Sequence, residues 1–202
     1  IKSGANDFLS KPFYHEEFYC RIMQNLESQE MIQTIRNSAN LDPLTKVYNR
    51  RFLYEKAEEL FANKASRKDV IVSMIDADNF KSVNDTYGHK TGDMLLQEFA
   101  ALLKDYFPDD LIVRYGGEEF TVVSVRPPKV YLSALSAFMD AVRSTTFTNH
   151  KFNITCSIGV CTEEHKCLES QLEVADARLY EAKHAGKDQI ILRDSVAKTV
   201  EA

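Results

Sequence analysis

Two adjacent carboxylates, Glu118 and Glu119, directly follow the pair Gly116 and Gly117. Like charges side by side repel each other, so we expect a cation close to them. A divalent metal ion that holds a polyphosphate would supply this cation, because Mg²⁺ binds carboxylate and phosphate oxygens. The glycines would let the phosphates of a second molecule approach the backbone. An ordinary hairpin whose acids face water explains the same four residues, so both interpretations stay open at this point.

A third carboxylate, Asp76, ends the apolar run 70–75. This run is typical of a central strand with acids at its exit. If the strand lies beside the hairpin, Asp76 meets Glu118 and Glu119 at one edge of the sheet. Three carboxylates around one point repel one another unless divalent cations lie between them. A pair of such ions can activate an attacking hydroxyl and stabilise a leaving pyrophosphate.

The segment 111–125 must position the two glutamates, and its β-branched runs on both sides of the glycine pair predict a hairpin with a tight turn. Further patterns predict helices at 49–64, 80–87, 93–106, 129–145 and 168–185, with breaks at Gly88 and Gly92, and strands at 70–75, 152–161 and 189–192, with a bulge at Gly159. This order predicts an α/β (α+β) domain in which helices cover the faces of a mixed sheet of about five strands.

The composition is that of an ordinary globular protein, with 202 residues, 44% of them apolar and 27% charged. The net charge of −5 argues against binding of a nucleic acid polymer, which needs a basic face. The sequence has no run of about 18 apolar residues and no signal peptide pattern, so we expect no membrane span. It begins with Ile1 rather than Met, so we expect a piece of a longer protein. The cysteines match no zinc spacing and predict reduced thiols of a cytoplasmic protein: Cys20, Cys156, Cys161 and Cys167.

Residues 1–14 contain the order Gly-Ala-x-Asp-Phe-Leu-x-Lys-Pro-Phe, which resembles the last strand and loop of a two-component receiver domain. An accidental loop explains this short match equally simply. The segment 15–40 carries apolar residues at roughly helical spacing, but Gln29 and Gln33 interrupt them, so a long strict heptad is not supported. We expect a receiver remnant at 1–14, a helical stalk at 15–40 that could hold two chains side by side, and a tail at 196–202.

Several separated motifs resemble, in the same order, those of the GGDEF diguanylate cyclases, here in a GGEEF variant. The matching pieces are Asp42-Pro43-Leu44-Thr45, Asn49-Arg50-Arg51, Asp76-x-Asp78-x-Phe80-Lys81-x-x-Asn84-Asp85, Gly88-His89-x-x-Gly92-Asp93, Arg114-Tyr115-Gly116-Gly117-Glu118-Glu119-Phe120, Ser157-Ile158-Gly159-Val160 and Ala175-Asp176-x-x-Leu179-Tyr180-x-Ala182-Lys183-x-x-Gly186-Lys187. The resemblance implies a catalytic domain over 41–195, with a fold close to the nucleotidyl cyclase and polymerase palm and an active site on the hairpin.

The resemblance also implies roles for single residues. Asp76 would bind both metal ions, and Ala77 would lend its main-chain carbonyl. Glu118 would be a metal ligand and a base for the 3′-hydroxyl, while Glu119 completes the acidic cluster. Which of the two glutamates takes the proton stays open. The implied cofactor is Mg²⁺, two ions per half-site, with Mn²⁺ as an alternative.

Asn84 and Asp93 match the pair that reads guanine in the family. A carboxylate accepts hydrogen bonds from both N1–H and N2–H of guanine, and adenine lacks that pair of donors. A cyclase that also accepts ATP is less expected but stays open. Four positions match phosphate contacts: Phe80, Lys81, Lys183 and Lys187. Because the family usually has Arg at the last of these, Lys187 keeps the charge but lacks the bidentate fork.

Family members with product inhibition carry Arg-x-x-Asp shortly before the signature. The equivalent stretch here keeps the aspartate as Asp110 but has Phe107 in place of the arginine. Without a guanidinium to hold a phosphate, we expect no high-affinity inhibitory site of this type.

The expected reaction is the condensation of two GTP molecules into cyclic di-GMP. Each 3′-hydroxyl must attack the other GTP, so a homodimer is expected. The resemblance further implies that this is the output domain of a bacterial response regulator, with an upstream receiver domain and a cognate histidine kinase as partners. Two alternatives remain: a catalytically silent GTP- or dinucleotide-binding module that signals through partners, and an interaction-only output domain.

Overall fold

The computed structural model describes residues 8, 12, 14–62, 69–148 and 152–192. Its contacts divide the chain into two units, Ile1–Asn40 and Leu41–Ala202. Most of the receiver-like stretch at 1–14, including its expected short strand, lies outside the described residues, and so does the expected tail at 196–202. The last two residues of the helix predicted at 49–64 lie outside them as well.

The first unit contains one long helix, α1 (His15–Asn40). Acidic residues occupy its first turn, where they complement the positive end of the helix dipole. Phe18, Ile22 and Leu26 follow one another at helical spacing and are exposed by 42%, 41% and 53%. Although α1 has 26 residues, neither it nor any other described helix combines the length and the apolar character needed to cross a membrane.

The second unit is built on a mixed sheet of six strands in the order β1-β3-β4-β2-β5-β6. The strands are β1 (Tyr48–Asn49), β2 (Ile71–Ala77), β3 (Leu111–Gly116), β4 (Glu119–Ser124), β5 (Cys156–Cys161) and β6 (Ile190–Ile191). The short outer strands pair in parallel, β1 with β3 and β6 with β5, and the inner pairs are antiparallel. The predicted mixed α/β architecture is confirmed. The count of about five strands missed β1, which is too short to show a strand pattern.

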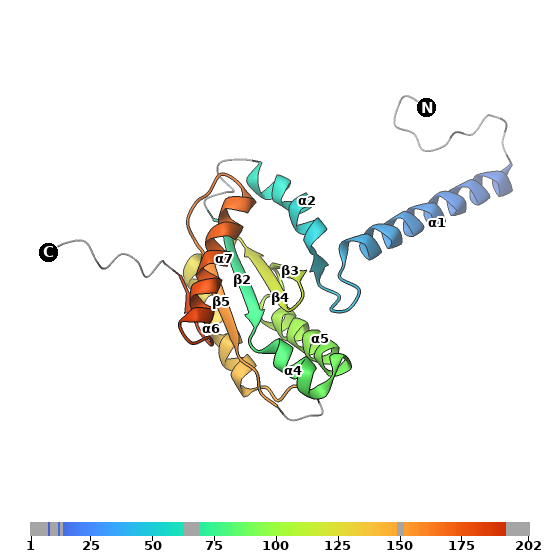
Figure 1. Ribbon diagram of the computed structural model, residues 1–202. Helices are drawn as coiled ribbons and strands as arrows, with labels where there is room; N and C mark the ends of the chain where they lie inside the picture. Colours follow the sequence, from blue (N-terminus) through green and yellow to red (C-terminus); the bar gives the residue numbers. More distant parts are fainter. Residues whose placement is uncertain (1–7, 9–11, 13, 63–68, 149–151, 193–202) are drawn as a thin grey trace. The chain divides into compact units, whose positions relative to one another are not determined.

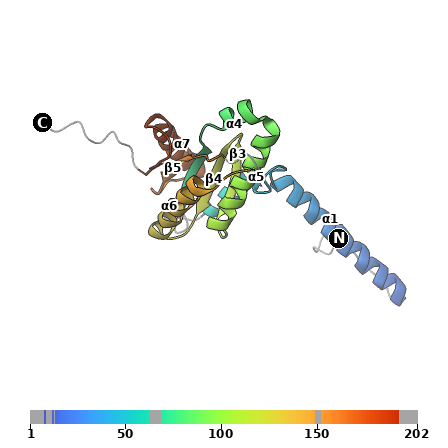
Figure 2. The same ribbon diagram turned by 90° about the horizontal axis from the view of Figure 1, so that it is seen from below.

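Helices cover both faces of this sheet (Figures 1 and 2). One face carries α4 (Phe80–Tyr87), α5 (His89–Tyr106) and α6 (Pro128–Ser144), and the other carries α2 (Arg50–Phe61) and α7 (Leu168–His184). The local sequence sets several of these helix ends. The Asn49 side chain accepts a hydrogen bond from the Phe52 amide at 3.0 Å and caps α2, and Pro128 opens α6.

The central strand β2 explains how the sheet delivers a carboxylate to its edge. All seven residues of β2 are buried, and successive side chains point to opposite faces. Ile71 and Ile75 pack in the core beneath α5 and α6, whereas Val72 and Met74 pack beneath α7. Asp76 continues the second set, so its side chain lies on the α7 face of the sheet.

Two glycines have a different role from the one predicted. Gly92 was expected to interrupt a helix but lies inside α5, and a Cβ atom there would stand 2.0 Å from Asn84 Oδ1. Gly159 was expected at a bulge, yet β5 pairs with β2 in unbroken register. A Cβ atom at Gly159 would stand 2.1 Å from the carbonyl oxygen of Ala175 in α7. Both glycines therefore allow close packing rather than ending or bending an element.

The helix α7 is tied to β5 by a nearly buried arginine. Arg178 donates to the Val160 carbonyl at 2.7 Å and, through both terminal nitrogens, to the Glu163 carboxylate at 2.8 Å. The arginine side chain is 6% exposed and the glutamate side chain 44%. The Arg178 hydrogen bonds lower the pKa of Glu163 from 4.5 to about 2, against a smaller opposing effect of burial. The pair therefore anchors α7 as long as Glu163 is ionised.

We expect Glu163→Gln to lower the free energy of unfolding by about 1–2 kcal/mol at pH 7, the lower range for charge-assisted pairs because Glu163 is half-exposed. The folded-state pKa is depressed, so this stabilisation is present above pH 4.5 and is lost as the pH falls towards about 2. Urea unfolding at several pH values measures it, with Glu164→Gln at the exposed neighbouring position as the control. A difference between wild type and Glu163→Gln that does not shrink in acid would contradict the linkage.

Candidate active site

The sheet brings the third carboxylate to the hairpin, as the sequence predicts. In the β2–β4 ladder Asp76 stands opposite Glu119. The Ala77 amide donates to the Glu118 carbonyl at 3.4 Å, beside the hairpin turn. Directly opposed residues of an antiparallel pair point to the same face, so Glu119 shares the α7 face with Asp76.

Asp76 is a buried acid next to a lysine from α7. It is 5% exposed, and burial, together with the negative charges of Glu118 and Glu119, raises its pKa to about 6. Lys183 Nζ lies 2.7 Å from Asp76 Oδ2 and partly offsets this effect. The residues are 107 positions apart in the sequence, so only the packing of α7 on the sheet brings them together. The electrostatics of the site thus favour positive charge beside Asp76.

The expected metal ligands lie side by side at the end of β2 and around the start of the neighbouring strand β4, but their side chains are not gathered into a metal cage. Within the described part of the chain, no three acidic, histidine or cysteine side chains lie close enough together to hold a metal ion. The donors nevertheless suit Mg²⁺, since Asp76, Glu118 and Glu119 offer hard oxygen atoms and Asp76 already attracts a cation. In this structure that cation is the ammonium group of Lys183.

The hairpin turn is anchored by an arginine that the sequence analysis did not single out. Gly117 takes a left-handed conformation with φ of 49°, and the added residue of a bulge lies between Arg114 and Gly116. Arg114 Nε donates to the Gly117 carbonyl at 2.9 Å, and its Nη1 contacts both Asp42 carboxylate oxygens at 3.1 and 3.3 Å. The motif that begins at Asp42 therefore holds the turn. At Gly116, an added Cβ atom would meet no other atom within 4 Å.

We expect Arg114→Ala to loosen this turn. Because the guanidinium joins the Gly117 carbonyl to Asp42, its loss should speed amide hydrogen exchange at Gly117 and Glu118 by about tenfold, the equivalent of one hydrogen bond. Arg51→Ala is the matched control, since Arg51 lies in an exposed pair with Glu55. Unchanged exchange at the turn would show that Arg114 does not hold it.

The predicted base-reading residues come from neighbouring helices. The Asn84 side chain of α4 lies against Gly92 of α5, and the next residue, Asp93, is exposed. Asn84 Oδ1 is buried and has no hydrogen-bond partner among the described residues. Phe80 is partly buried and also packs against Gly92. The structure thus leaves a polar atom of Asn84 for a ligand to satisfy.

The three predicted phosphate-binding lysines lie at different places. Lys183 pairs with Asp76, and Lys187 Nζ donates to Asn79 Oδ1 at 2.6 Å, at the start of α4. Lys81 lies in the first turn of α4 and is exposed. Two of the lysines therefore reach the exit of β2 from α7 and the turn that follows it.

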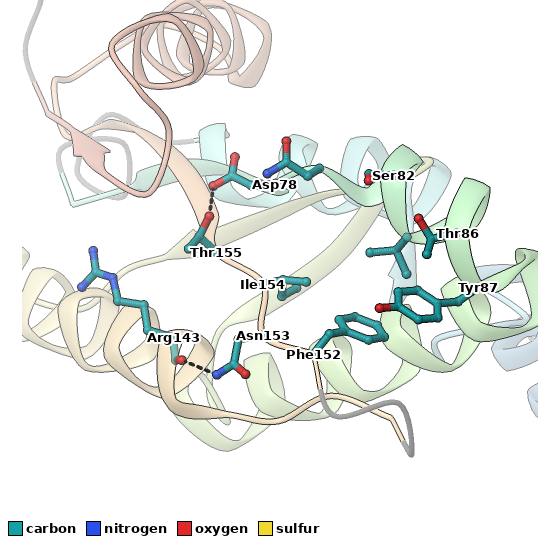
Figure 3. A pocket seen from close by; sticks show the side chains of 11 residues that line it. Asp78, Ser82, Thr86, Tyr87, Arg143, Phe152, Asn153, Ile154 and Thr155 are labelled. Carbon is teal, nitrogen blue, oxygen red and sulfur yellow. Dashed lines mark hydrogen bonds between the residues drawn. The ribbon is translucent and has the colours of Figure 1, made fainter.

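Asp78 organises this exit, although the sequence analysis gave it no role beyond the motif. It is 2% exposed and accepts a hydrogen bond from Thr155 Oγ1 at 2.6 Å (Figure 3). It also accepts hydrogen bonds from Ser157 Oγ at 2.7 Å and from the Asp188 amide at 3.1 Å. A cavity of about 370 Å³ lies between α4 and the segment 152–155, and Arg143 also lines it. Figure 3 shows the side chains of the lining. Asp78 thus joins β2, β5 and the turn after α7.

Phe107 and Asp110, the two residues at the positions of the inhibitory motif, have buried side chains. Phe107 is fully buried, with its ring 5.6 Å from that of Tyr131 and 5.8 Å from that of Phe138. The Asp110 side chain is 2% exposed and lies 3.1 Å from Arg126 Nη2. Burial raises the pKa of Asp110, and Arg126 and Ser124 oppose this effect. Both of these side chains are therefore almost completely buried.

Comparison with known proteins gives consistent matches. The family model described as "Diguanylate cyclase, GGDEF domain" matches residues 39–189. "Probable diguanylate cyclase DgcT" of Escherichia coli (strain K12) is 33% identical over 187 residues, which cover 89% of this chain and 40% of DgcT. "Response regulator PleD" of Caulobacter vibrioides (strain NA1000 / CB15N) is 31% identical over 210 residues, which cover 95% of this chain and 46% of PleD.

Among solved structures, the coiled coil and GGDEF domain of DgcB from Caulobacter crescentus, in complex with c-di-GMP, superposes with a TM-score of 0.77 at 25% identity. The match covers 88% of this chain and 98% of the DgcB chain. The chain spans less than half the length of DgcT and of PleD.

Proposed function

The chain belongs to the GGDEF family of diguanylate cyclases, and from this membership we propose that it condenses two GTP molecules into cyclic di-GMP with release of two pyrophosphates. The observation that carries the proposal is the meeting at one sheet edge of Asp76, the Glu118–Glu119 hairpin and Lys183. A buried acid with a raised pKa beside two further acids needs positive charge, and a metal-bound triphosphate brings it.

The side chains divide the work of holding GTP. Asn84 and Asp93 bind the guanine base, where the unsatisfied Asn84 oxygen gains a partner. Lys81, Lys183 and Lys187 bind the phosphates, together with the backbone at Phe80. The first turn of α4 adds the positive end of a helix dipole.

Asp76, the Ala77 carbonyl, Glu118 and Glu119 are the groups that would hold Mg²⁺, two ions per half-site. The bound ions supply charge stabilisation to the α-phosphate and to the leaving pyrophosphate. Glu118 or Glu119 takes the proton of the 3′-hydroxyl, whose oxygen forms a bond to the α-phosphorus of the opposite GTP. The bond between the α-phosphorus and the bridging oxygen of the β-phosphate breaks, and pyrophosphate leaves. The chain thereby supplies a base and a fixed geometry.

Two chains are needed, because one half-site holds one GTP and each product contains two. The facing half-sites are related by a two-fold axis, and α1 is the element proposed to pair with its copy. Its exposed Phe18, Ile22 and Leu26 support this role. The rate per chain should therefore rise with protein concentration until the dimer saturates. A rate per chain that is independent of concentration down to nanomolar protein would count against this arrangement, unless sedimentation shows that the dimer persists.

We further propose a response-regulator context. The receiver-like stretch at 1–14 and the similarity to a protein named as a response regulator support an upstream receiver domain, phosphorylated by a histidine kinase. Phosphorylation would then control the cyclase through the geometry of the α1 pair. The proposed GTP substrate supports a cytoplasmic location for the domain.

We expect no product inhibition through the Phe107–Asp110 stretch. The arginine is absent, Phe107 is buried and Asp110 faces Arg126, so no guanidinium–carboxylate pair is free to grip cyclic di-GMP. Initial rates with increasing added product should stay unchanged well above micromolar concentrations. Submicromolar inhibition that Asp110→Ala relieves would refute this expectation.

A further inference from the structure

We propose that Asn79 is a positioning residue that aims the ammonium group of Lys187 at the triphosphate. This inference rests on the proposed function, because it assigns Lys187 to the phosphates of GTP. The contact that carries it is the hydrogen bond of 2.6 Å from Lys187 Nζ to Asn79 Oδ1.

The Asn79 side chain does not make the hydrogen bond that asparagine usually makes at the start of a helix. Asn79 is the N-cap residue of α4, where asparagine ordinarily accepts a hydrogen bond from a backbone amide of the first turn. The α4 N-cap has no such side-chain bond. The carboxamide oxygen of Asn79 is instead turned to Lys187. In this turn the Ser82 amide donates to the Asn79 carbonyl at 2.8 Å, which leaves the amides of Phe80 and Lys81 for another acceptor, and phosphate oxygens suit them.

Both partners stand on left-handed backbone. Asn79 has φ of 61°, Lys187 has φ of 64° and Asp188 has φ of 49°. Asparagine adopts this region readily, whereas lysine adopts it rarely because of its Cβ atom. Such conformations persist where the surrounding structure enforces them, and they gather at functional sites. The left-handed conformation of Lys187 is thus consistent with a residue that has a function in ligand binding.

The surroundings do enforce the turn. The Lys187 amide donates to the Ala182 carbonyl at 2.9 Å, and the Asp188 amide donates to Asp78 Oδ2 at 3.1 Å. Arg143 Nε contacts both Asp188 carboxylate oxygens at 2.9 and 3.0 Å. Asp78 is itself fixed by Thr155, as Figure 3 shows. The backbones that carry Asn79 and Lys187 are therefore locked to each other through the Asp78–Asp188 bond.

The chemistry explains why a neutral acceptor stands at this position. A lysine ammonium has three N–H donors on a flexible stem, so a single bond to Asn79 fixes its direction and leaves two donors for phosphate oxygens. The amide oxygen does not cancel the charge of Lys187. Lys183 differs, because its partner is the Asp76 carboxylate. A carboxylate at position 79 would hold Lys187 equally well but would neutralise it and repel the triphosphate.

Calorimetric titration of the full chain tests the proposal with two probes in the presence of Mg²⁺. The first probe is guanosine 5′-(α,β-methylene)triphosphate, in which the bond that breaks in the reaction is blocked, and the second is GMP. Asn79→Gly keeps the left-handed backbone accessible and removes the whole side chain, including the carboxamide that holds Lys187. We expect it to weaken triphosphate binding about five- to tenfold, the effect of one ordinary hydrogen bond, because the contact is exposed, and to leave GMP binding unchanged. Asn79→Asp should weaken triphosphate binding further.

Lys187→Met provides the second arm, since it keeps the stem and removes the charge. Adding Asn79→Gly to Lys187→Met should cause no further loss if Asn79 acts through Lys187. Ser82→Ala, one turn further along α4, is the control and should bind both probes as wild type does.

Equal weakening of both probes by Asn79→Gly would overturn the proposal, because it would indicate a general structural role at the start of α4. Additive losses in the double variant, or wild-type triphosphate affinity in Asn79→Gly, would overturn it as well. A wild-type chain that binds neither probe would overturn the proposed function together with the inference. The two failures are therefore distinguishable.

Discussion

Glu118→Gln should abolish the formation of cyclic di-GMP while leaving the fold intact. Glu118 lies in the hairpin turn, where its carbonyl accepts a bond from Ala77, and its negative charge acts on Asp76. Glutamine keeps the size of the side chain but removes both the negative charge and the basic oxygen. A residue that is proposed as metal ligand and base should cost on the order of a thousandfold or more in rate.

Chromatography of the products, with circular dichroism as the test of folding, measures this effect. Glu164→Gln, an exposed glutamate outside the site, should keep wild-type turnover. Persistent activity in Glu118→Gln would show that the site is wrongly assigned. The matching Glu119→Gln variant then bears on the question the sequence left open, because the variant that lacks the proton acceptor should lose the acid limb that this residue contributes to the pH–rate profile.

Gly159→Ala should destabilise the domain by about 3 kcal/mol or more, as expected for overpacking against immovable backbone. The added Cβ would stand 2.1 Å from the Ala175 carbonyl oxygen and 2.2 Å from the Leu179 amide nitrogen, both in α7. Neither atom belongs to a flexible side chain, so α7 must move away from β5. Lys183 would move with the helix, and we therefore expect activity to fall together with stability.

Urea unfolding measures the change in stability. Gly116→Ala is the stability control, because its added Cβ meets no atom within 4 Å. A Gly159→Ala variant as stable as wild type would show that α7 and β5 can separate at low cost.

The order of elements in the domain could be predicted because each long element carries its own pattern. The apolar run of β2, the β-branched strands of the hairpin and the proline at the start of α6 all act locally. Strand β1 could not be predicted, since two residues show no periodicity and β1 is defined by its pairing with β3 and by a bridge from Tyr48 to Leu41. The predictions of a helix break at Gly92 and a bulge at Gly159 were wrong. At both positions the close approach of a neighbouring element, and not the local backbone, accounts for the glycine.

The candidate site divides in the same way. The acids at the end of β2 and after the hairpin turn could be predicted from the sequence, because strand ends and turns have local sequence patterns. Contacts that depend on packing between distant elements are not. Arg114 with Asp42, Lys183 with Asp76 and Asn79 with Lys187 join positions 72, 107 and 108 residues apart. No local pattern links such residues, and only the placement of α7 and of the hairpin reveals them.

The central claim, that this chain joins two GTP molecules into one cyclic dinucleotide, is tested most directly by its products. The purified chain is incubated with GTP and Mg²⁺, and in parallel with ATP and Mg²⁺, and the nucleotides are separated by chromatography. We predict cyclic di-GMP and pyrophosphate from GTP and no cyclic product from ATP. GTP that binds but is recovered unchanged at high protein concentration would contradict the account and indicate a silent GTP-binding module.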